Sequence, residues 1–371
     1  MLATIKRLLP MAEKVVDRRS PLSILKTLCL ENKTARVTDL ETTLVMPAQD
    51  DRSYCLPLDL LKKTLKSGPQ DLQIEQSGGR LVLVHDGRRL SCKGLEPGDF
   101  PLVPQGKFKV IGKWPQELFG ELLLQSRFAS SDELRPALRG VHVLQIGNEL
   151  QSHATDSHVL RIHRGLKIAS GKPFEGIVPV KPLLLLARFA RGNTTVAASK
   201  EHLRFSLPGE MVLYVRLIQE KYPDLAAVIP TEFTGSAILD REELLGLVKA
   251  AMPFADRDTH LMMLETGEGS AIMTVDNPEA DTKWEASLKL SGQQGGSLRI
   301  GFNLKLLERL LSLQQSPTVL WQFTNSSSAS MFTEIGEQWE SGAKTILMPI
   351  RLKQENANAN EKRHHRHTAE A

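Results

Sequence analysis

The stretch CLPLDLLKKTLKSG, residues 55–68, joins a short apolar strand to an amphipathic helix, and the same pattern returns twice further along the chain. The two copies are IVPVKPLLLLARFARG at 177–192 and IGFNLKLLERLLSLQ at 300–314. They follow one another at intervals of about 120 residues, a period that indicates an internal repeat. Three copies of one domain would account for the 371 residues of the chain.

Each repeat also contains an earlier helix, in which apolar residues recur at helical spacing, as at Leu244 and Val248. These helices are expected near 4–16, 115–129 and 240–255. The remaining segments alternate like half-buried strands, and Asp86-Gly87 is a hairpin turn signal between two of them. The pattern predicts an α+β fold of three repeated domains, each an antiparallel sheet with two helices on one face.

An aromatic–Pro pair marks the end of the first two repeats. It occurs in GDFPLVPQG at 98–106 and again in KYPDLAAVIP at 221–230. The predicted domains are therefore 1–111, 112–231 and 232–352. The last stretch, 353–371, has almost no apolar residues and is predicted to be a disordered basic tail.

Composition narrows the class of protein. With 41% hydrophobic and 24% charged residues, and no apolar run long enough for a membrane span, the chain is expected to be soluble and cytoplasmic. Its three cysteines, Cys29, Cys55 and Cys92, lie among strand-like residues without CxxC spacing, which favours buried thiols over disulfides or zinc ligands. The net charge of +4 permits an anionic partner without requiring one.

The sequence offers little for an enzyme. The glycines of GEGS (267–270) and GQQGG (292–296) lack a Walker or dinucleotide fingerprint and are better explained as hairpin turns. One group of residues resembles a metal site on paper, but its aspartate has a repeat counterpart, Asp39, that has no histidines near it, so a structural turn is favoured. Its members are His153, Asp156, His158 and His163. We expect no catalytic residue, no metal and no cofactor.

Seven short motifs together resemble one known family. They are RSPLSIL, VTDLETTLV, GDFPLVP, ATDSHVLRI, KYPDLAAVIP, IGFN and ILMPIRL, in order over about 350 residues. The chain resembles the bacterial sliding clamp, the non-catalytic beta subunit of DNA polymerase III. The resemblance implies a homodimer whose six domains form a ring around duplex DNA without reading its sequence. It implies as partners the polymerase catalytic subunit, the clamp loader and other proteins with clamp-binding peptides, and no membrane.

A ring that slides on DNA needs a positive inner face with loose phosphate contacts. The predicted helices carry more basic than acidic residues, although such residues also solvate exposed helix faces. By resemblance, Arg19 and Lys181 match positions near DNA. The full predicted set is Arg19, Lys181, Lys62, Lys66, Arg188, Arg191 and Lys305. Pro136-Ala137 stands where many clamps have an aromatic pair, a departure that affects the DNA contact of that loop.

For ring closure, the resemblance pairs the first domain of one subunit with the third domain of the other. The matching residues are Phe100, Leu102, Met252 and Pro253. Flanking charges would favour this heterologous pairing. The basic ones are Arg88, Arg89 and Lys93, and the acidic ones are Asp276, Glu279, Asp281 and Glu285. The alternative is that the four apolar residues are ordinary core.

The resemblance also implies a groove between the second and third domains that takes a short peptide with apolar anchors. The matching positions are Leu138, Thr155, His158, Leu160, Pro223, Val228, Asn303, Leu306, Ser327, Ala329, Ile346, Met348, Pro349 and Ile350. Thr155, His158 and Asn303 would hydrogen-bond the peptide backbone. Where many clamps have Arg or Tyr, this chain has Val159, Ala227 and Leu306, so a more apolar groove is expected.

Two alternatives remain open at the level of sequence. One is a specialised clamp paralogue, plasmid- or phage-like, that serves a particular polymerase. The other is a monomeric protein-interaction scaffold that has kept the fold and lost ring closure. A native mass near one chain or near two chains separates the scaffold from a ring.

Overall fold

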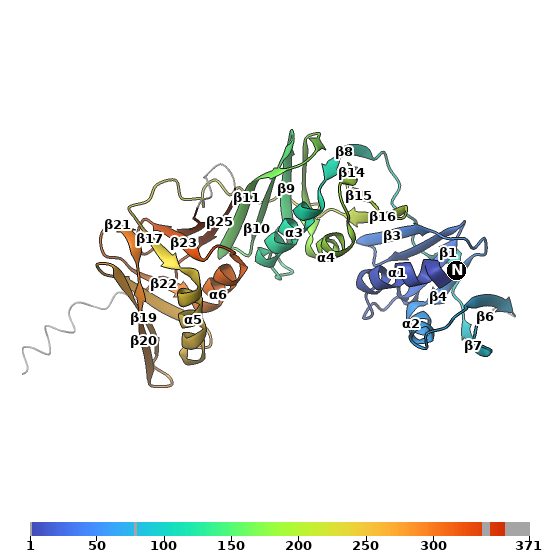
Figure 1. Cartoon of the computed structure of the whole chain (residues 1–371), viewed down its shortest axis with the longest axis horizontal. Helices are drawn as coiled ribbons and strands as arrows, with labels where there is room; N and C mark the ends of the chain where they lie inside the picture. The colour runs from blue at the N-terminus through green and yellow to red at the C-terminus, as the bar shows by residue number, and fades with distance from the viewer. Residues whose placement is uncertain (1, 78–79, 336–341, 353–371) are drawn as a thin grey trace, which may run out of the picture. The chain divides into compact units, whose positions relative to one another are not determined.

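The computed structural model describes residues 2–77, 80–335 and 342–352 (Figure 1). They form two compact units. Unit 1 contains 2–157 and 161–223 together with Gly342, and unit 2 contains 158–160, 224–335 and 343–352. The predicted basic tail, 353–371, lies outside the described residues.

The largest sheet of unit 1 has nine strands. They are β1 (Thr27–Glu31), β2 (Thr34–Thr38), β3 (Thr42–Pro47), β4 (Tyr54–Pro57), β8 (Lys109–Trp114), β12 (Ser170–Gly171), β14 (Thr194–Ala198), β15 (His202–Leu207) and β16 (Met211–Arg216). Their order is β12-β8-β14-β15-β16-β3-β2-β1-β4. The register of β16 on β3 sets Leu213 opposite Leu44, so one hydrogen-bonded sheet joins the first two repeats.

This shared sheet explains why two repeats make one unit. Leu44 and Leu213 are both fully buried, so the strand pair joining the repeats is also part of a common core. The strand β8 begins at Lys109, before the predicted limit between 111 and 112. The predicted limits of the three domains stay predictions.

Unit 1 has two further sheets. Their strands are β5 (Gln73–Ser77), β6 (Arg80–His85), β7 (Arg88–Lys93), β9 (Gly140–Ile146), β10 (Glu149–Thr155), β11 (Val159–Lys167) and β13 (Phe174–Pro179). The orders are β5-β6-β7 and β13-β9-β10-β11. The predicted hairpin turn is confirmed, since Asp86 and Gly87 both have positive φ, 44° and 71°, between β6 and β7.

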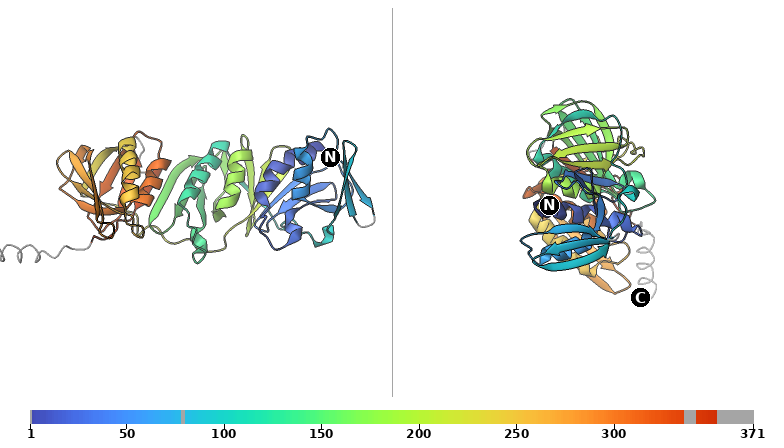
Figure 2. Two further views of the ribbon diagram at one scale, coloured as in Figure 1. Left: turned by 90° about the horizontal axis from the view of Figure 1, so that it is seen from below. Right: turned by 90° about the vertical axis from the view of Figure 1, so that its right-hand side faces the viewer.

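Four α-helices of the described part of unit 1 lie side by side (Figure 2). They are α1 (Leu2–Val15), α2 (Leu58–Lys66), α3 (Gln116–Gln125) and α4 (Val180–Phe189). Helix α1 packs on β2 and β3 and contacts both α2 and α4, while α4 also contacts α3. The helices therefore form one row, α2-α1-α4-α3, across both repeats.

Unit 2 contains the third repeat. Its strands are β17 (Gly235–Asp240), β18 (Leu261–Thr266), β19 (Ser270–Asn277), β20 (Thr282–Lys289), β21 (Ser291–Gln294), β22 (Arg299–Asn303), β23 (Thr318–Phe323), β24 (Ser330–Glu334) and β25 (Gly342–Leu347). Within the unit they run β25-β24-β23-β17-β21 and β20-β19-β18-β22. The core holds Phe302, Trp321 and Phe332, whose ring centroids are 6.0–6.4 Å apart.

The helices of unit 2 are α5 (Arg241–Ala251) and α6 (Leu304–Leu313), which pack together. Asp240 caps α5 by accepting from the Glu243 amide at 2.8 Å. Helices α2, α4 and α6 each follow a strand directly, as the quoted repeat predicted, with Pro57, Pro179 and Asn303 at their N-caps. The predicted α+β fold, with antiparallel sheets and two α-helices in each repeat, is confirmed for the described residues.

Two predicted helices end in short 3-10 turns. The turn η3 (Ser126–Phe128) follows α3, and η5 (Met252–Phe254) follows α5. Pro253 lacks a backbone N–H and cannot continue the α-helical ladder, which accounts for the second change. The remaining 3-10 turns are η1 (Ser23–Lys26), η2 (Pro97–Asp99) and η4 (Pro136–Leu138).

The two aromatic–Pro motifs anchor the ends of their repeats. Phe100 is buried against Cys29 and Cys55. Tyr222 is buried and stacks on His142, with ring centroids 4.5 Å apart. In each case the aromatic ring is fixed in the interior, while the prolines that follow lead the chain away from it.

Candidate functional site

Arg19 and Lys181 come together at the junction of the first two repeats. They line one open pocket of about 660 Å³ between the segment after α1, the β2–β3 turn and the start of α4. The Arg19 side chain is 96% exposed and has only a long contact with Asp17, 3.9 Å. Its charge is available to an anion in solvent.

Lys181 is held more tightly than its neighbour. Its Nζ donates to the carbonyl of Val15 at 2.7 Å and forms an ion pair with Asp39, the aspartate of the repeated Thr-Asp turn. The Asp39 carboxylate is buried, whereas the lysine is about one-third exposed. Much of the positive charge of Lys181 is therefore neutralised within the protein, and Arg19 is the freer cation of the two.

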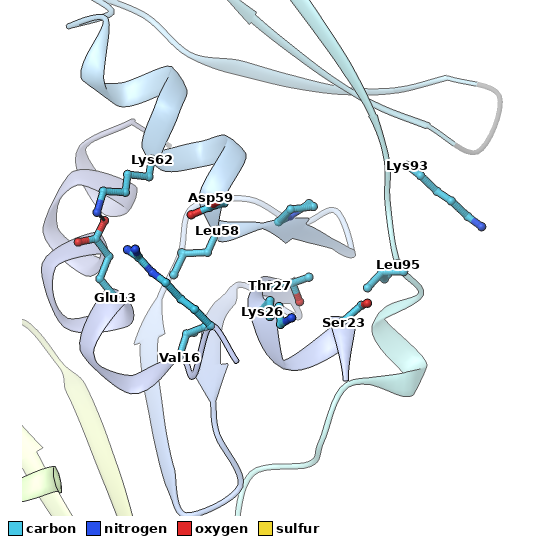
Figure 3. A pocket seen from close by; sticks show the side chains of 12 residues that line it. Glu13, Val16, Ser23, Lys26, Thr27, Leu58, Asp59, Lys62, Lys93 and Leu95 are labelled. Atoms are coloured by element: carbon cyan, nitrogen blue, oxygen red, sulfur yellow. Dashed lines mark ion pairs between the residues drawn. The ribbon is translucent and has the colours of Figure 1, made fainter. Parts of the chain in front are cut away.

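The other predicted DNA contacts differ in how exposed they are. The Nζ of Lys62 pairs with Glu13 at 2.7 Å, and the Lys62 side chain is 29% exposed, because α1 and α2 pack together there (Figure 3). Arg191 donates to the carbonyls of Arg188 and Ala190, at 2.8 and 2.7 Å, and so covers the end of α4.

Most of the predicted cations project into solvent. Lys66 and Lys305 are exposed, and the exposed Arg188 lies over the ring of Phe189 at 5.4 Å. Lys6, Lys14 and Lys63 are also exposed on α1 and α2. The row of helices in unit 1 therefore presents a basic face made of long, mobile side chains, which suits loose contact with phosphates.

Two sheets have outer strands that present predicted ring-closing residues. Strand β7 is the last strand of the β5-β6-β7 sheet, and every residue in it except Cys92 is exposed. Its Arg89 pairs with Glu75 at 2.7 Å. Strand β20 lies at the edge of the four-stranded sheet of unit 2, where Glu285 pairs with Lys283 at 3.0 Å.

The four apolar residues predicted for the dimer interface divide into two kinds. Leu102 is 80% exposed and Pro253 is exposed, so both can meet a partner. Met252 is half-buried. Phe100 is 3% exposed and belongs to the core of the first repeat, with its ring under Arg36, which agrees with the alternative of an ordinary core residue.

The C-terminal segment is fixed within unit 2 by backbone hydrogen bonds. The Met348 amide donates to the carbonyl of His158 at 2.9 Å, and the Ile350 amide donates to Gly301 at 2.8 Å. The Met348 side chain is 40% exposed. Three residues of the TDSHVL motif thus belong to the same unit as the chain's last strand.

The remaining predicted peptide contacts differ in exposure. In unit 2, His158, Val228 and Ser327 are exposed, and Leu306, Pro349 and Ile350 are half-buried. Leu160, Ala329 and Ile346 are buried in the single chain, and their predicted contact with a peptide stays a prediction. In unit 1, Pro223 is exposed, whereas Leu138 and Thr155 are buried.

Two of the three predicted backbone-binding groups are already engaged. The side-chain oxygen of Asn303 accepts from the amides of Lys305 and Leu306, at 2.9 and 3.2 Å, as the N-cap of α6. Its side-chain nitrogen donates to Thr259. The Thr155 hydroxyl accepts from the Ser157 amide at 3.0 Å. His158 is the group of this kind whose side chain reaches solvent.

Two histidines of the group that resembles a metal site in the sequence, His153 and His163, lie in different surroundings. His153 lies opposite His142, with their Nδ1 atoms 3.3 Å apart, and His163 pairs with Glu121 at 3.1 Å. Within the part of the chain that the structure describes, no group of three or more His, Cys, Asp or Glu could hold a metal ion. No described helix is long and apolar enough to cross a membrane.

Burial of the His142–His153 pair predicts a loss of stability in acid. Desolvation, with His142 and Arg164 nearby, lowers the pKa of His153 from 6.5 to about 4. Burial also lowers the pKa of His142, against the opposing effect of Glu175. Below pH 6.5 the unfolded chain binds protons that the folded chain excludes until about pH 4, so stability should fall by about 2 kcal/mol between pH 6.5 and pH 5 and continue to fall towards pH 4.

Urea unfolding at pH 7 and pH 5 measures this effect. His153→Gln should flatten the difference, whereas the exposed His158→Gln should leave it unchanged. An equal loss of stability in acid for the His153 variant would show that other groups cause it.

A buried polar network was not anticipated. Arg161 donates to the side-chain oxygen of Gln125 at 2.6 Å, and Gln125 donates to the carbonyls of Arg161 and Ser152. The hydrogen bond from His163 and the charge of Arg161 hold the pKa of Glu121 below its usual value. Strand alternation predicts that residues 161 and 163 lie on one face of β11. No pattern in the sequence predicts that they contact Gln125 and Glu121 of α3.

Comparison with known proteins gives consistent matches. Two family models match the chain: the central domain of the DNA polymerase III beta subunit over residues 113–224, and its C-terminal domain over 226–351. The beta sliding clamp of Pseudomonas putida is 27% identical over 355 residues, which cover 91% of this chain and 95% of that protein.

Solved structures agree with these matches. The DNA polymerase III subunit beta from Pseudomonas aeruginosa is 25% identical, with a TM-score of 0.84 over 94% of this chain and 98% of that one. A sliding clamp from the same organism bound to griselimycin has the same identity, TM-score and coverage.

Proposed function

The chain belongs to the family of the bacterial DNA polymerase III beta subunit, the sliding clamp, and we propose that two copies close into a ring that tethers the polymerase to duplex DNA. As a DNA sliding clamp it is a processivity factor for replication. The observation that carries the proposal is the row of helices α2-α1-α4-α3, which presents exposed cations and is supported by one sheet running through two repeats.

The proposed hold on DNA is electrostatic and does not depend on base sequence. Long lysine and arginine side chains reach phosphates without fixed geometry, so neighbouring positions on the duplex are nearly equal in energy and the ring can slide. The chain supplies Arg19, Lys66 and Arg188 from unit 1 and Lys305 from unit 2 for such contacts. Replication of DNA implies a cytoplasmic location in a bacterium.

The proposed ring is a head-to-tail homodimer. The edge strand β7 and the exposed Leu102 of one copy would meet β20 and the Met252–Pro253 turn of the other. Arg88 and Lys93 are exposed on β7, opposite in charge to the acidic residues on and before β20. Light scattering at micromolar concentration tests this, because a scaffold without ring closure would stay at 41.2 kDa.

The proposed partner site lies around Met348 in unit 2. Met348 adapts its shape to different apolar anchors, and His158, Val228 and Leu306 offer further solvent-accessible surface. The catalytic subunit of the polymerase, the clamp loader and other proteins would each present a short peptide to this site. A peptide of this kind binds by apolar anchors, with the rest of its chain exposed.

Replacing Arg19 with Glu is expected to weaken duplex binding about fivefold at low salt and to reduce its salt dependence by about one phosphate contact. Fluorescence anisotropy with a labelled duplex over a salt series measures both. Lys181→Gln should have a smaller effect, since Asp39 already neutralises that lysine. Asp39→Asn should strengthen duplex binding, because it removes the carboxylate that neutralises the positive charge of Lys181.

Each variant must remain dimeric in light scattering for this comparison to hold. If Arg19→Glu binds the duplex as well as the parent protein over the whole salt series, Arg19 does not contact phosphates. Strong preference between two duplexes of equal length would contradict a sequence-independent hold.

A further inference from the structure

Two of the three cysteines face each other across a strand pair. Cys29 on β1 lies directly opposite Cys55 on β4 in an antiparallel register. The N–H and C=O of Cys55 both bond to Leu95 on its other side, at 3.3 Å, so Cys29 and Cys55 form a non-hydrogen-bonded pair. In such pairs the Cα atoms are only about 4.5 Å apart and the side chains share one face, which falls in the range of disulfides.

The surroundings of the pair make Cys29 the more acidic of the two thiols. Both cysteines are fully buried, and Nη2 of Arg36 lies 3.6 Å from the Cys29 sulfur. The hydrogen bond between the two thiols and the guanidinium of Arg36 lower the pKa of Cys29, although burial opposes them. The same thiol–thiol hydrogen bond, together with burial, raises the pKa of Cys55.

A cavity provides an approach to the pair. It has a volume of about 460 Å³ and lies between α1, η1, β1, α2 and the segment after β7 (Figure 3). Its lining includes Thr27 of β1 and Leu95, which packs against the buried cluster of Cys29, Cys55 and Phe100. Thr27 is two residues from Cys29 on β1, and Leu95 bonds to the backbone of Cys55, so the cavity lies next to the strand pair that carries both cysteines.

We propose that Cys29 and Cys55 are a redox-active thiol pair that a hydroperoxide converts into a reversible cross-strand disulfide. With hydrogen peroxide as the oxidant, the Cys29 thiolate attacks one peroxide oxygen and the O–O bond breaks. Cys29 becomes a sulfenic acid, and the other peroxide oxygen takes up the thiol proton and leaves as water. The Cys55 sulfur then attacks the Cys29 sulfur and displaces a second water. The two thiols lose two electrons and two protons, and the peroxide is reduced to two waters.

Cys92 is a natural internal control for this chemistry. It lies on β7 opposite Leu81, and no thiol faces it across the strand pair. It is 8% exposed, and burial raises its pKa, so it has neither a resolving partner nor an activated sulfur. If exposure alone governed oxidation, Cys92 would react before the fully buried pair.

The pair lies beneath the segment that carries Leu102. Phe100 packs on both sulfur-bearing side chains, and two residues later Leu102 projects into solvent. Drawing the two sulfur atoms to bonding distance would move the side chains on which the Phe100 aromatic ring packs. This consequence rests on the proposed ring closure: oxidation is expected to weaken the dimer about tenfold, which light scattering of oxidised and reduced protein measures.

The chemistry itself is tested on full-length Cys92→Ser protein, in which only Cys29 and Cys55 remain. The folded protein is treated with hydrogen peroxide, quenched with catalase, denatured and alkylated with N-ethylmaleimide, and its intact mass is measured. The expected product has lost the mass of two hydrogen atoms and carries no maleimide. After reduction and a second alkylation it carries two maleimides. Cys29→Ser and Cys55→Ser in the same background should form no intrachain disulfide.

Two results would overturn the proposal. One is a folded protein that still binds two maleimides after peroxide treatment, while the same chain in urea is oxidised. The other is a product containing only intermolecular disulfides. Because the mass measurement does not depend on dimerisation, a protein that is already monomeric when reduced and still forms the disulfide would refute the proposed ring and leave the thiol pair established.

Discussion

Replacing Leu102 with aspartate is expected to leave a folded monomer of 41.2 kDa at micromolar concentration, where we expect the parent protein to be a dimer. Leu102 is 80% exposed in the single chain, so the substitution removes almost no intramolecular packing. In the proposed ring the same position meets the Met252–Pro253 turn of the other copy. Burying an unpaired carboxylate in a dry interface makes the free energy of dimerisation less favourable by about 4 kcal/mol. This raises the dimer Kd by about a thousandfold.

The chain offers a matched control for that experiment. Leu134 is 90% exposed and also lies in unit 1, in a different loop, so Leu134→Asp changes the surface charge equally and should remain dimeric. Phe100→Ala should act differently, lowering thermal stability because its ring is part of the core. A dimeric Leu102→Asp protein would show that the copies meet through another surface.

The burial of Phe100 shows a limit of prediction from sequence. The spacing of the aromatic–Pro motif predicted the end of the first repeat, and the period-2 and helical patterns predicted the α+β fold with antiparallel sheets correctly. The alternating pattern could not determine on which side of the motif the chain turns inward. Phe100 and Leu102 share the same parity, yet one is core and the other projects into solvent, because the motif is not a regular strand.

The predicted cations show a second limit. Lys62 and Lys66 lie four residues apart on α2, and no pattern in the sequence distinguishes them. The structure places Glu13 of α1 beside Lys62, whereas Lys66 lies at the free end of the helix. Lys181 likewise meets Asp39, a residue 142 positions away. Charge pairing between distant segments depends on how helices and turns pack, which local periodicity does not encode.

Met348→Asp is expected to weaken a polymerase-derived clamp-binding peptide by a hundredfold or more, about 3 kcal/mol, with ring and fold intact. The C-terminal segment is fixed by its backbone bonds to His158 and Gly301, so the Met348 side chain is exposed from a rigid support. A carboxylate there would be desolvated by an apolar anchor without gaining a partner. Leu160, also predicted for this groove, is buried, so its truncation would lower stability and could not isolate binding.

Fluorescence polarisation with a labelled peptide provides the measurement, and Met348→Leu is the matched control. Leucine keeps the volume and polarity of methionine, so its peptide affinity should stay within about threefold of the parent. Ile272→Asp adds the same charge to an exposed apolar position of unit 2 far along the sequence and should leave affinity unchanged. If Met348→Asp binds the peptide as well as Met348→Leu does, the anchor contacts a different part of the chain. The half-buried side chains of Leu306 and Ile350 would then be the next residues to test.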